Sequence, residues 1–257
     1  MMFSEGINKL ADASEKKVVL LKESKTKYIL ASMLAGIYVG FGILLIFSIG
    51  GILSAANSPF TKIIMGVSFG IALSLVLMAG SELFTGNNLI MTVGALEKKV
   101  TWKSALNVWI FSYIGNFIGS FLLGLMFTYS GLPKGNIAKF IISGTKNKIA
   151  APSMELFIRG ILCNMLVCLA VWCFFKLKEE GAKLIMIFWC LFAFITAGFE
   201  HSVANMTLFS IAYMIPHGLE ITFGGLMHNM LWVTLGNFVG GALFIGWTYW
   251  YISKKQS

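Results

Sequence analysis

Six long apolar stretches limit what this chain can fold into. A helix needs about 20 mostly apolar residues to cross the hydrocarbon core of a bilayer, and each stretch reaches that length. Only 12% of the 257 residues are charged, about half the share of a soluble domain, which excludes an ordinary soluble enzyme and a disordered chain. The sequence therefore predicts an all-α membrane protein with spans at about 29–54, 63–96, 105–129, 154–175, 184–215 and 226–252.

The lysines outside these stretches predict how the protein is oriented. An even number of spans places both termini on one side, and that side carries the N-terminal lysines, Lys98, Lys99 and Lys103 after the second span, and three more lysines after the fourth. Because positive residues remain on the cytoplasmic side, we expect cytoplasmic termini in the cell membrane. The net charge of +9 is then explained by topology and contact with lipid headgroups, so no nucleic-acid partner is expected.

The segment before the first span, residues 1–28, has a different pattern. Apolar residues recur at helical spacing over about 4–25 among charged ones, which predicts an amphipathic helix on the cytoplasmic face. This helix is expected to anchor the chain to the membrane surface, and a gating role is the alternative. Because the segment is polar from its start, we expect no cleavable signal peptide. Residues 29–257 form the six-span domain.

Two sequence motifs occur twice, in the same order. Residues 79–87 (AGSELFTGN) and 197–205 (AGFEHSVAN) both fit A-G-x-E-x-x-x-x-N and interrupt the two longest spans, and residues 115–119 (GNFIG) match 236–240 (GNFVG). The chain is therefore read as two three-span copies, at about 29–130 and 152–252. An odd number of spans per copy inverts the second one, and broken spans at matching positions point to a permeation site.

Both breaks contain a glutamate. Glu82 and Glu200 are the acids near the middle of the membrane, where a charge is costly and usually functional. Because both copies carry it, we favour a structural role in which these carboxylates, with Asn87 and Asn205, shape the two breaks.

His201 differs between the copies, because its counterpart is Leu83. An imidazole can donate a hydrogen bond to an anion and exchange a proton near neutral pH. The alternative is a buried histidine that bonds the backbone at the break. Thr85 in the first break and Asn164 in the fourth span are further donors. Lys148, just before the fourth span, is either an attractor of anions or one solvated charge among several.

Other chemistries fit poorly. Glu200, His201 and Ser202 are consecutive, and neighbours on a helix do not face one another, so a catalytic triad is not expected. The chain has no H-x-x-x-H or H-E-x-x-H pattern. Its four cysteines lie inside apolar stretches without a C-x-x-C pair. We therefore expect no enzyme activity, no metal and no cofactor.

Four segments together carry a family resemblance: 79–87 (AGSELFTGN), 160–172 (GILCNMLVCLAVW), 197–206 (AGFEHSVANM) and 235–244 (LGNFVGGALF). Over essentially its whole length the chain resembles the formate/nitrite transporter family. The resemblance implies an aquaporin-like fold and a homopentamer with one pore through each protomer. It assigns pore positions to His201, Thr85, Asn164 and Lys148. It also assigns apolar constrictions to Phe69, Leu73, Leu83, Val167 and Phe194.

The resemblance also implies the substrates, which are small monovalent anions: formate, nitrite and, in one branch, hydrosulfide. The sequence is most similar to the clostridial hydrosulfide branch. The family's E-L-F-T-S loop departs here to E-L-F-T-G-N-N at 82–88, which weakens the expectation of formate selectivity. We therefore expect a hydrosulfide channel, with formate or nitrite also possible substrates. The alternatives are a proton-coupled transporter of the same family, a sodium-coupled transporter and an aquaporin-like channel for neutral solutes; the last predicts paired N-P-A motifs, which are absent.

Overall fold

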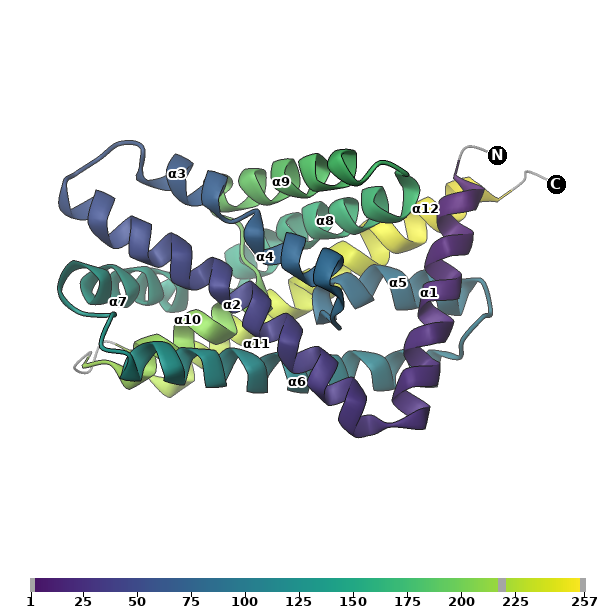
Figure 1. Ribbon diagram of the computed structural model, residues 1–257, viewed down its shortest axis with the longest axis horizontal. Coiled ribbons are helices and arrows are strands. Elements are labelled where there is room, and N and C mark those ends of the chain that lie inside the picture. Colours follow the sequence, from purple (N-terminus) through teal and green to yellow (C-terminus); the bar gives the residue numbers. More distant parts are fainter. Residues whose placement is uncertain (1–2, 217–220, 255–257) are drawn as a thin grey trace.

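The computed structural model describes residues 3–216 and 221–254, and every regular element in these ranges is a helix. The described part of the chain contains six helices that are long and apolar enough to cross a membrane, which confirms the predicted fold class. Most of them run along the long axis of the molecule (Figure 1). The spans are Lys25–Ala55, Thr61–Gly80, Trp102–Tyr129, Ser153–Lys176, Glu180–Ala197 and Phe223–Ser253.

Helix α1 (Ser4–Glu23) precedes the first span, α2 (Lys25–Ala55). Ser24 separates them with an extended backbone, and its hydroxyl caps α2 by accepting a hydrogen bond from the Lys27 N–H at 3.2 Å. The apolar face of α1, including Ile7 and Leu10, is buried. Figure 1 shows α1 lying across one end of the molecule, beside the C-terminal helix α12 (Thr248–Ser253).

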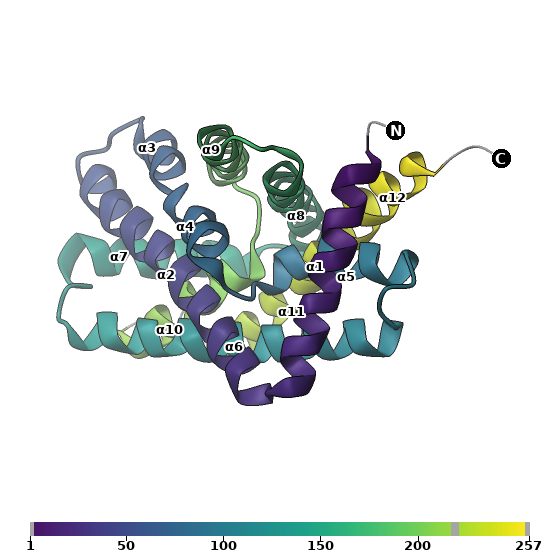
Figure 2. The same ribbon diagram turned by 45° about the vertical axis from the view of Figure 1, so that its right-hand side comes forward.

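The second and fifth spans are broken, as the repeated motif predicts. The second runs through α3 (Thr61–Ser68), α4 (Ile71–Leu75) and the π-helix η1 (Val76–Gly80), and the chain resumes as α5 (Phe84–Leu96). The fifth runs through α9 (Glu180–Ala197) and resumes as α10 (Ser202–Met214). Figure 2 shows the extended segment between α9 and α10.

The glycines of the A-G-x-E motif explain where the spans break. Gly80 and Gly198 have φ angles of +82° and +80°, a left-handed conformation that glycine adopts without the steric cost of a Cβ atom. Each ends its helix and turns the following residues into an extended path.

The connection before the fourth span contains a helix that the sequence pattern does not predict. Helix α7 (Gly135–Ala150) buries Ile141 and Thr145 and lies at the end of the molecule opposite α1 (Figures 1 and 2). Its apolar positions are too few to stand out beside the spans. The remaining helices are α6 (Trp102–Tyr129), α8 (Ser153–Lys176) and α11 (Phe223–Val239), the last of which continues into the π-helix η2 (Gly240–Trp247) and then α12.

Glycines bring the spans into close contact in both halves. A Cβ atom on Gly160 of α8 would lie 2.8 Å from the Val233 carbonyl oxygen of α11, and one on Gly119 of α6 would lie 2.0 Å from the Met33 carbonyl oxygen of α2. Small residues of this kind let membrane helices pack backbone against backbone. This packing holds the two breaks in the interior of the protein.

Candidate permeation site

The asparagines of the repeated G-N-F motif hold the two breaks in shape. The amide nitrogen of Asn116 donates to the carbonyl oxygens of Ser32 at 2.7 Å and Glu82 at 2.9 Å, and its side-chain oxygen accepts from the Phe84 N–H at 2.9 Å. The bonds to Glu82 and Phe84 satisfy backbone groups that the interrupted helix leaves without partners, and the bond to Ser32 ties the break to α2.

The second break repeats this arrangement. The amide nitrogen of Asn237 donates to the carbonyl oxygens of Gly160 at 2.8 Å and Glu200 at 2.9 Å, and its side-chain oxygen accepts from the Ser202 N–H at 2.8 Å. The same three bonds in both halves explain why the motif with this asparagine occurs twice. They also supply a residue-by-residue correspondence between the copies.

Each break glutamate is paired with a lysine from a helix that does not span the membrane. The Glu82 carboxylate lies 2.7 Å from the Lys17 ammonium of α1, and the Glu200 carboxylate lies 2.8 Å from the Lys148 ammonium of α7. Lys17 was not among the predicted site residues. The signal that could have found it is its place ahead of the first span, as Lys148 precedes the fourth.

Further hydrogen bonds hold both carboxylates. The amide nitrogen of Asn87 donates to Glu82 at 3.3 Å, and that of Asn205 donates to Glu200 at 2.7 Å. The Tyr28 hydroxyl also donates to Glu82, at 2.8 Å. The structure therefore places all four residues expected to shape the breaks in contact with their partners.

His201 lies at the start of α10 and faces the first break. Its Nδ1 accepts the Ala204 N–H at 3.1 Å, and its Nε2 lies 3.0 Å from the Thr85 hydroxyl oxygen. Since Nδ1 accepts, a neutral ring carries its proton on Nε2 and donates it toward Thr85. The ring therefore caps a helix at the break, which is the structural interpretation, and its Nε2 meets Thr85 of the first half. A donor role toward an anion stays a prediction.

Asn164 contacts the backbone of Thr85. Its amide nitrogen donates to the carbonyl oxygens of Thr85 at 3.3 Å and Asn237 at 2.5 Å, so its donors meet the backbone of α5 and α11. The side chain is fully buried. This geometry suits a residue that positions Thr85.

A cavity of about 280 Å³ opens at the α7 end of the molecule and reaches His201. We call it the α7 vestibule. Its walls carry the Lys148–Glu200 pair, and Lys62 and Arg159 add two further cationic side chains. Phe194 stacks beside the His201 ring at the inner end, with the ring centroids 6.0 Å apart.

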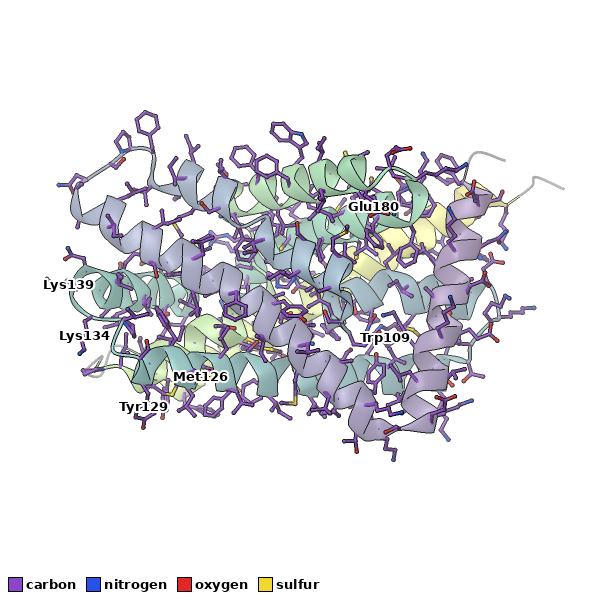
Figure 3. The ribbon with its side chains drawn as sticks, in the orientation of Figure 1. Trp109, Met126, Tyr129, Lys134, Lys139 and Glu180 are labelled. Atoms are coloured by element: carbon purple, nitrogen blue, oxygen red, sulfur yellow. The ribbon has the colours of Figure 1, made fainter. Side chains whose placement is uncertain are left out.

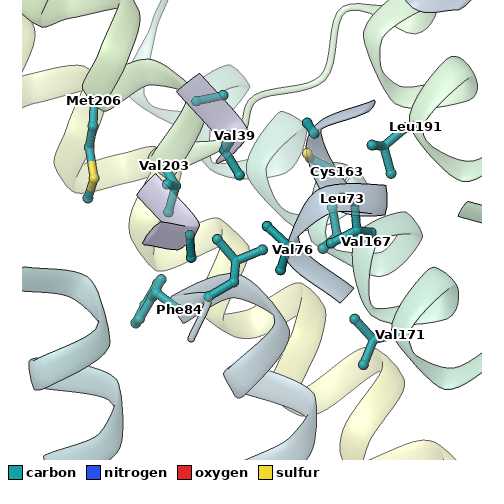
Figure 4. Packing of buried hydrophobic residues seen from close by; sticks show 14 of the residues in the cluster. Val39, Leu73, Val76, Phe84, Cys163, Val167, Val171, Leu191, Val203 and Met206 are labelled. Carbon is teal, nitrogen blue, oxygen red and sulfur yellow. The ribbon is translucent and has the colours of Figure 1, made fainter. Parts of the chain in front are cut away.

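Beyond His201 the interior narrows to an apolar space of about 10 Å³, roughly the room that one water molecule needs. Figure 4 shows that Val39, Leu73, Val167 and Leu191 converge here from different helices. All five residues expected to form constrictions line this space together with His201: Phe69, Leu73, Leu83, Val167 and Phe194.

The described residues hold no group of three or more histidine, cysteine or acidic side chains that could bind a metal ion. The cysteines in this part of the chain are all free.

Known proteins resemble this chain over nearly its full length. A family model described as formate/nitrite transporter matches residues 4–251. The nitrite transporter NirC of Escherichia coli (strain K12) is 42% identical, with 100% of this chain and 94% of the relative covered. A solved structure described as an FNT family ion channel has a TM-score of 0.93 and 39% identity and covers 98% of this chain and 100% of its own. A second solved structure, described as a pentameric formate channel with formate bound, has a TM-score of 0.81 and 28% identity. The match covers 91% of this chain and 99% of that structure's chain.

Proposed function

The chain belongs to the formate/nitrite transporter family and is a multi-pass membrane transport protein, not an enzyme, and we propose that it is a passive channel for small monovalent anions. The observation that carries this proposal is the position of His201. Its Nε2 lies 3.0 Å from Thr85 of the opposite half, between a vestibule with several cations and a narrow apolar space.

The first step is attraction of the anion to the α7 vestibule. Lys148 and its cationic neighbours raise the local anion concentration there. Glu200 is nearly buried and tied to Lys148 and Asn205, so its charge is compensated. The α1 end of the molecule carries an equivalent ion pair between Lys17 and Glu82.

The second step is passage through the apolar space, where the anion sheds water at a cost of several kcal/mol or more. The Nε2–H of His201 and the Thr85 hydroxyl are hydrogen-bond donors that replace part of this water. The bond from Ala204 to Nδ1 favours a ring that donates a hydrogen bond and keeps its proton.

Nitrite is the first candidate substrate, because a relative with 42% identity is described as a nitrite transporter. Hydrosulfide is the second candidate. It rests on the sequence resemblance to the hydrosulfide branch, and the departure from the family's E-L-F-T-S loop at Gly86 weakens formate selectivity. Formate is the third, given the formate channel among the structural neighbours.

The assembly and orientation of the chain complete the proposal. A structural neighbour is described as pentameric, and we propose that this chain also forms a homopentamer in the cell membrane. The lysine distribution supports cytoplasmic termini, with α1 on the cytoplasmic face and the α7 vestibule outside.

The test is a flux series in sealed liposomes that contain the purified protein. Nitrite, formate, hydrosulfide and chloride are supplied one at a time and in competition, with no ATP and no sodium or pH gradient. We expect passive anion flux well above that of empty liposomes. Flux that requires a pH gradient would instead identify a proton-coupled transporter, and water or glycerol flux without anion flux would identify a neutral-solute channel.

A further inference from the structure

The single arginine of this chain, Arg159, lies in the wall of the α7 vestibule. Its guanidinium lies 2.5 Å from the Glu155 carboxylate, and both side chains are about half exposed, at 42% and 51%. Exposed ion pairs of this kind contribute little to stability. Glu155 is therefore easily displaced by a competing anion, whereas the nearly buried Glu200 is held by Lys148 and Asn205.

The architecture of the break does not require an arginine at this position. The Arg159 carbonyl oxygen accepts the Glu200 N–H at 3.3 Å, and the Ala31 carbonyl oxygen accepts the Glu82 N–H at 3.1 Å in the other half. Arg159 and Ala31 are thus equivalent positions, and both support the break through the backbone alone. The α7 vestibule carries a guanidinium at a position where the α1 end of the molecule carries a methyl group.

The chemistry of the guanidinium group indicates which anions Arg159 would favour. The planar group presents parallel N–H donors that match the two oxygens of a flat anion, whereas a lysine ammonium acts as a point charge. Nitrite and formate each offer two oxygens on one central atom. Hydrosulfide and chloride offer a single acceptor atom and gain charge attraction without the paired bonds.

We propose that Arg159 is a selectivity site that binds flat two-oxygen anions, of the nitrite or carboxylate type, in the α7 vestibule before they reach His201. The proposal rests on the anion flux proposed above and adds its preference among anions. When Glu155 is displaced, the paired N–H donors of the guanidinium are free to bind the anion. The bound anion then shares one cavity with Lys148 and His201, so its release from Arg159 leads directly to the narrow space.

The test compares Arg159→Lys with the wild type in sealed liposomes. Arg159→Lys keeps the charge and loses the fork. We expect the ratio of nitrite to chloride flux, and of formate to hydrosulfide flux, to fall about fivefold, the size of an exposed charge-assisted contact. Chloride and hydrosulfide flux should stay near the wild-type values. Glu155→Gln, which frees the guanidinium, should raise nitrite flux at low nitrite concentration.

Lys139→Gln is the matched control for Arg159→Gln. Lys139 lies on α7 at the same end of the molecule, at the edge of the view in Figure 3, and is an exposed residue that does not line the vestibule. Arg159→Gln should lower nitrite flux while Lys139→Gln leaves it unchanged. An unchanged anion ratio in Arg159→Lys, or equal losses in Arg159→Gln and Lys139→Gln, overturns the proposal. A wild-type protein without any anion flux would instead refute the proposed function. Thermal melting of each variant in detergent confirms folding, and Glu155→Gln provides an independent test if an Arg159 variant fails to fold.

Discussion

At the scale of single residues, His201 caps the helix at the second break, and we propose a second role for it as a donor toward the anion. The Nδ1 atom caps α10 through the Ala204 N–H, and Nε2 faces Thr85. A sequence identifies the asymmetric histidine at the break but not which ring nitrogen meets the backbone, because that depends on the turn that follows the break. Lys17 was missed for a similar reason. One lysine on an amphipathic helix resembles its neighbours until the fold brings it to Glu82.

Substitution of His201 by asparagine separates these two roles. Asparagine is a strong helix N-cap, so His201→Asn should keep the bond from Ala204 and a melting temperature near that of the wild type. It loses the Nε2 donor, and we expect anion flux to fall about tenfold or more, since a hydrogen bond to a charged partner contributes about 1.5–3 kcal/mol. Liposome flux and melting in detergent measure the two effects. Wild-type flux in His201→Asn would refute the donor role, and His201→Leu should lose both functions.

At the scale of elements, apolar length was sufficient to find the six spans, because the bilayer sets that length. The repeated motif located the two breaks correctly, since Gly80 and Gly198 must adopt left-handed backbone there. The π-helices η1 and η2 and the helix α7 were not foreseen. A π-helix depends on a shift of backbone hydrogen bonds that leaves no residue pattern, and α7 is short and only partly apolar.

The hydrogen bonds of Asn116 predict a large loss of stability when they are removed. Asn116→Ala leaves the Glu82 carbonyl oxygen and the Phe84 N–H at the break without their side-chain partner, each at a cost of about 1–3 kcal/mol, and it also removes the bond to the Ser32 carbonyl oxygen of α2. We expect the free energy of unfolding in detergent micelles to drop by about 3 kcal/mol or more. Asn107→Ala, at an exposed position on the same helix, should be nearly neutral. Equal melting temperatures for the two variants would contradict this account of the break.

At the scale of the whole molecule, the inverted repeat organises the site. The sequence placed the two copies at about 29–130 and 152–252, and the structure adds a correspondence between α1 and α7, each of which supplies the lysine for its own break. The motifs could not show this, because α1 and α7 share only a general amphipathic pattern. The pairing of spans and the convergence of five constriction residues on His201 likewise depend on contacts between distant segments. The family resemblance pointed to those five residues, whereas their hydrophobicity alone would have suggested ordinary packing.

The central claim is that each protomer conducts anions through the narrow space beside His201, and closing that space tests it most directly. Leu73→Phe places a larger side chain in the lining of the narrow space, whose volume is only about 10 Å³. Leu106→Phe makes the same substitution on an exposed face of α6. Passive nitrite flux into sealed liposomes should fall to nearly the level of empty liposomes for Leu73→Phe and stay at the wild-type level for Leu106→Phe, with both proteins folded and of wild-type size. Undiminished nitrite flux through folded Leu73→Phe would show that the anions take another path.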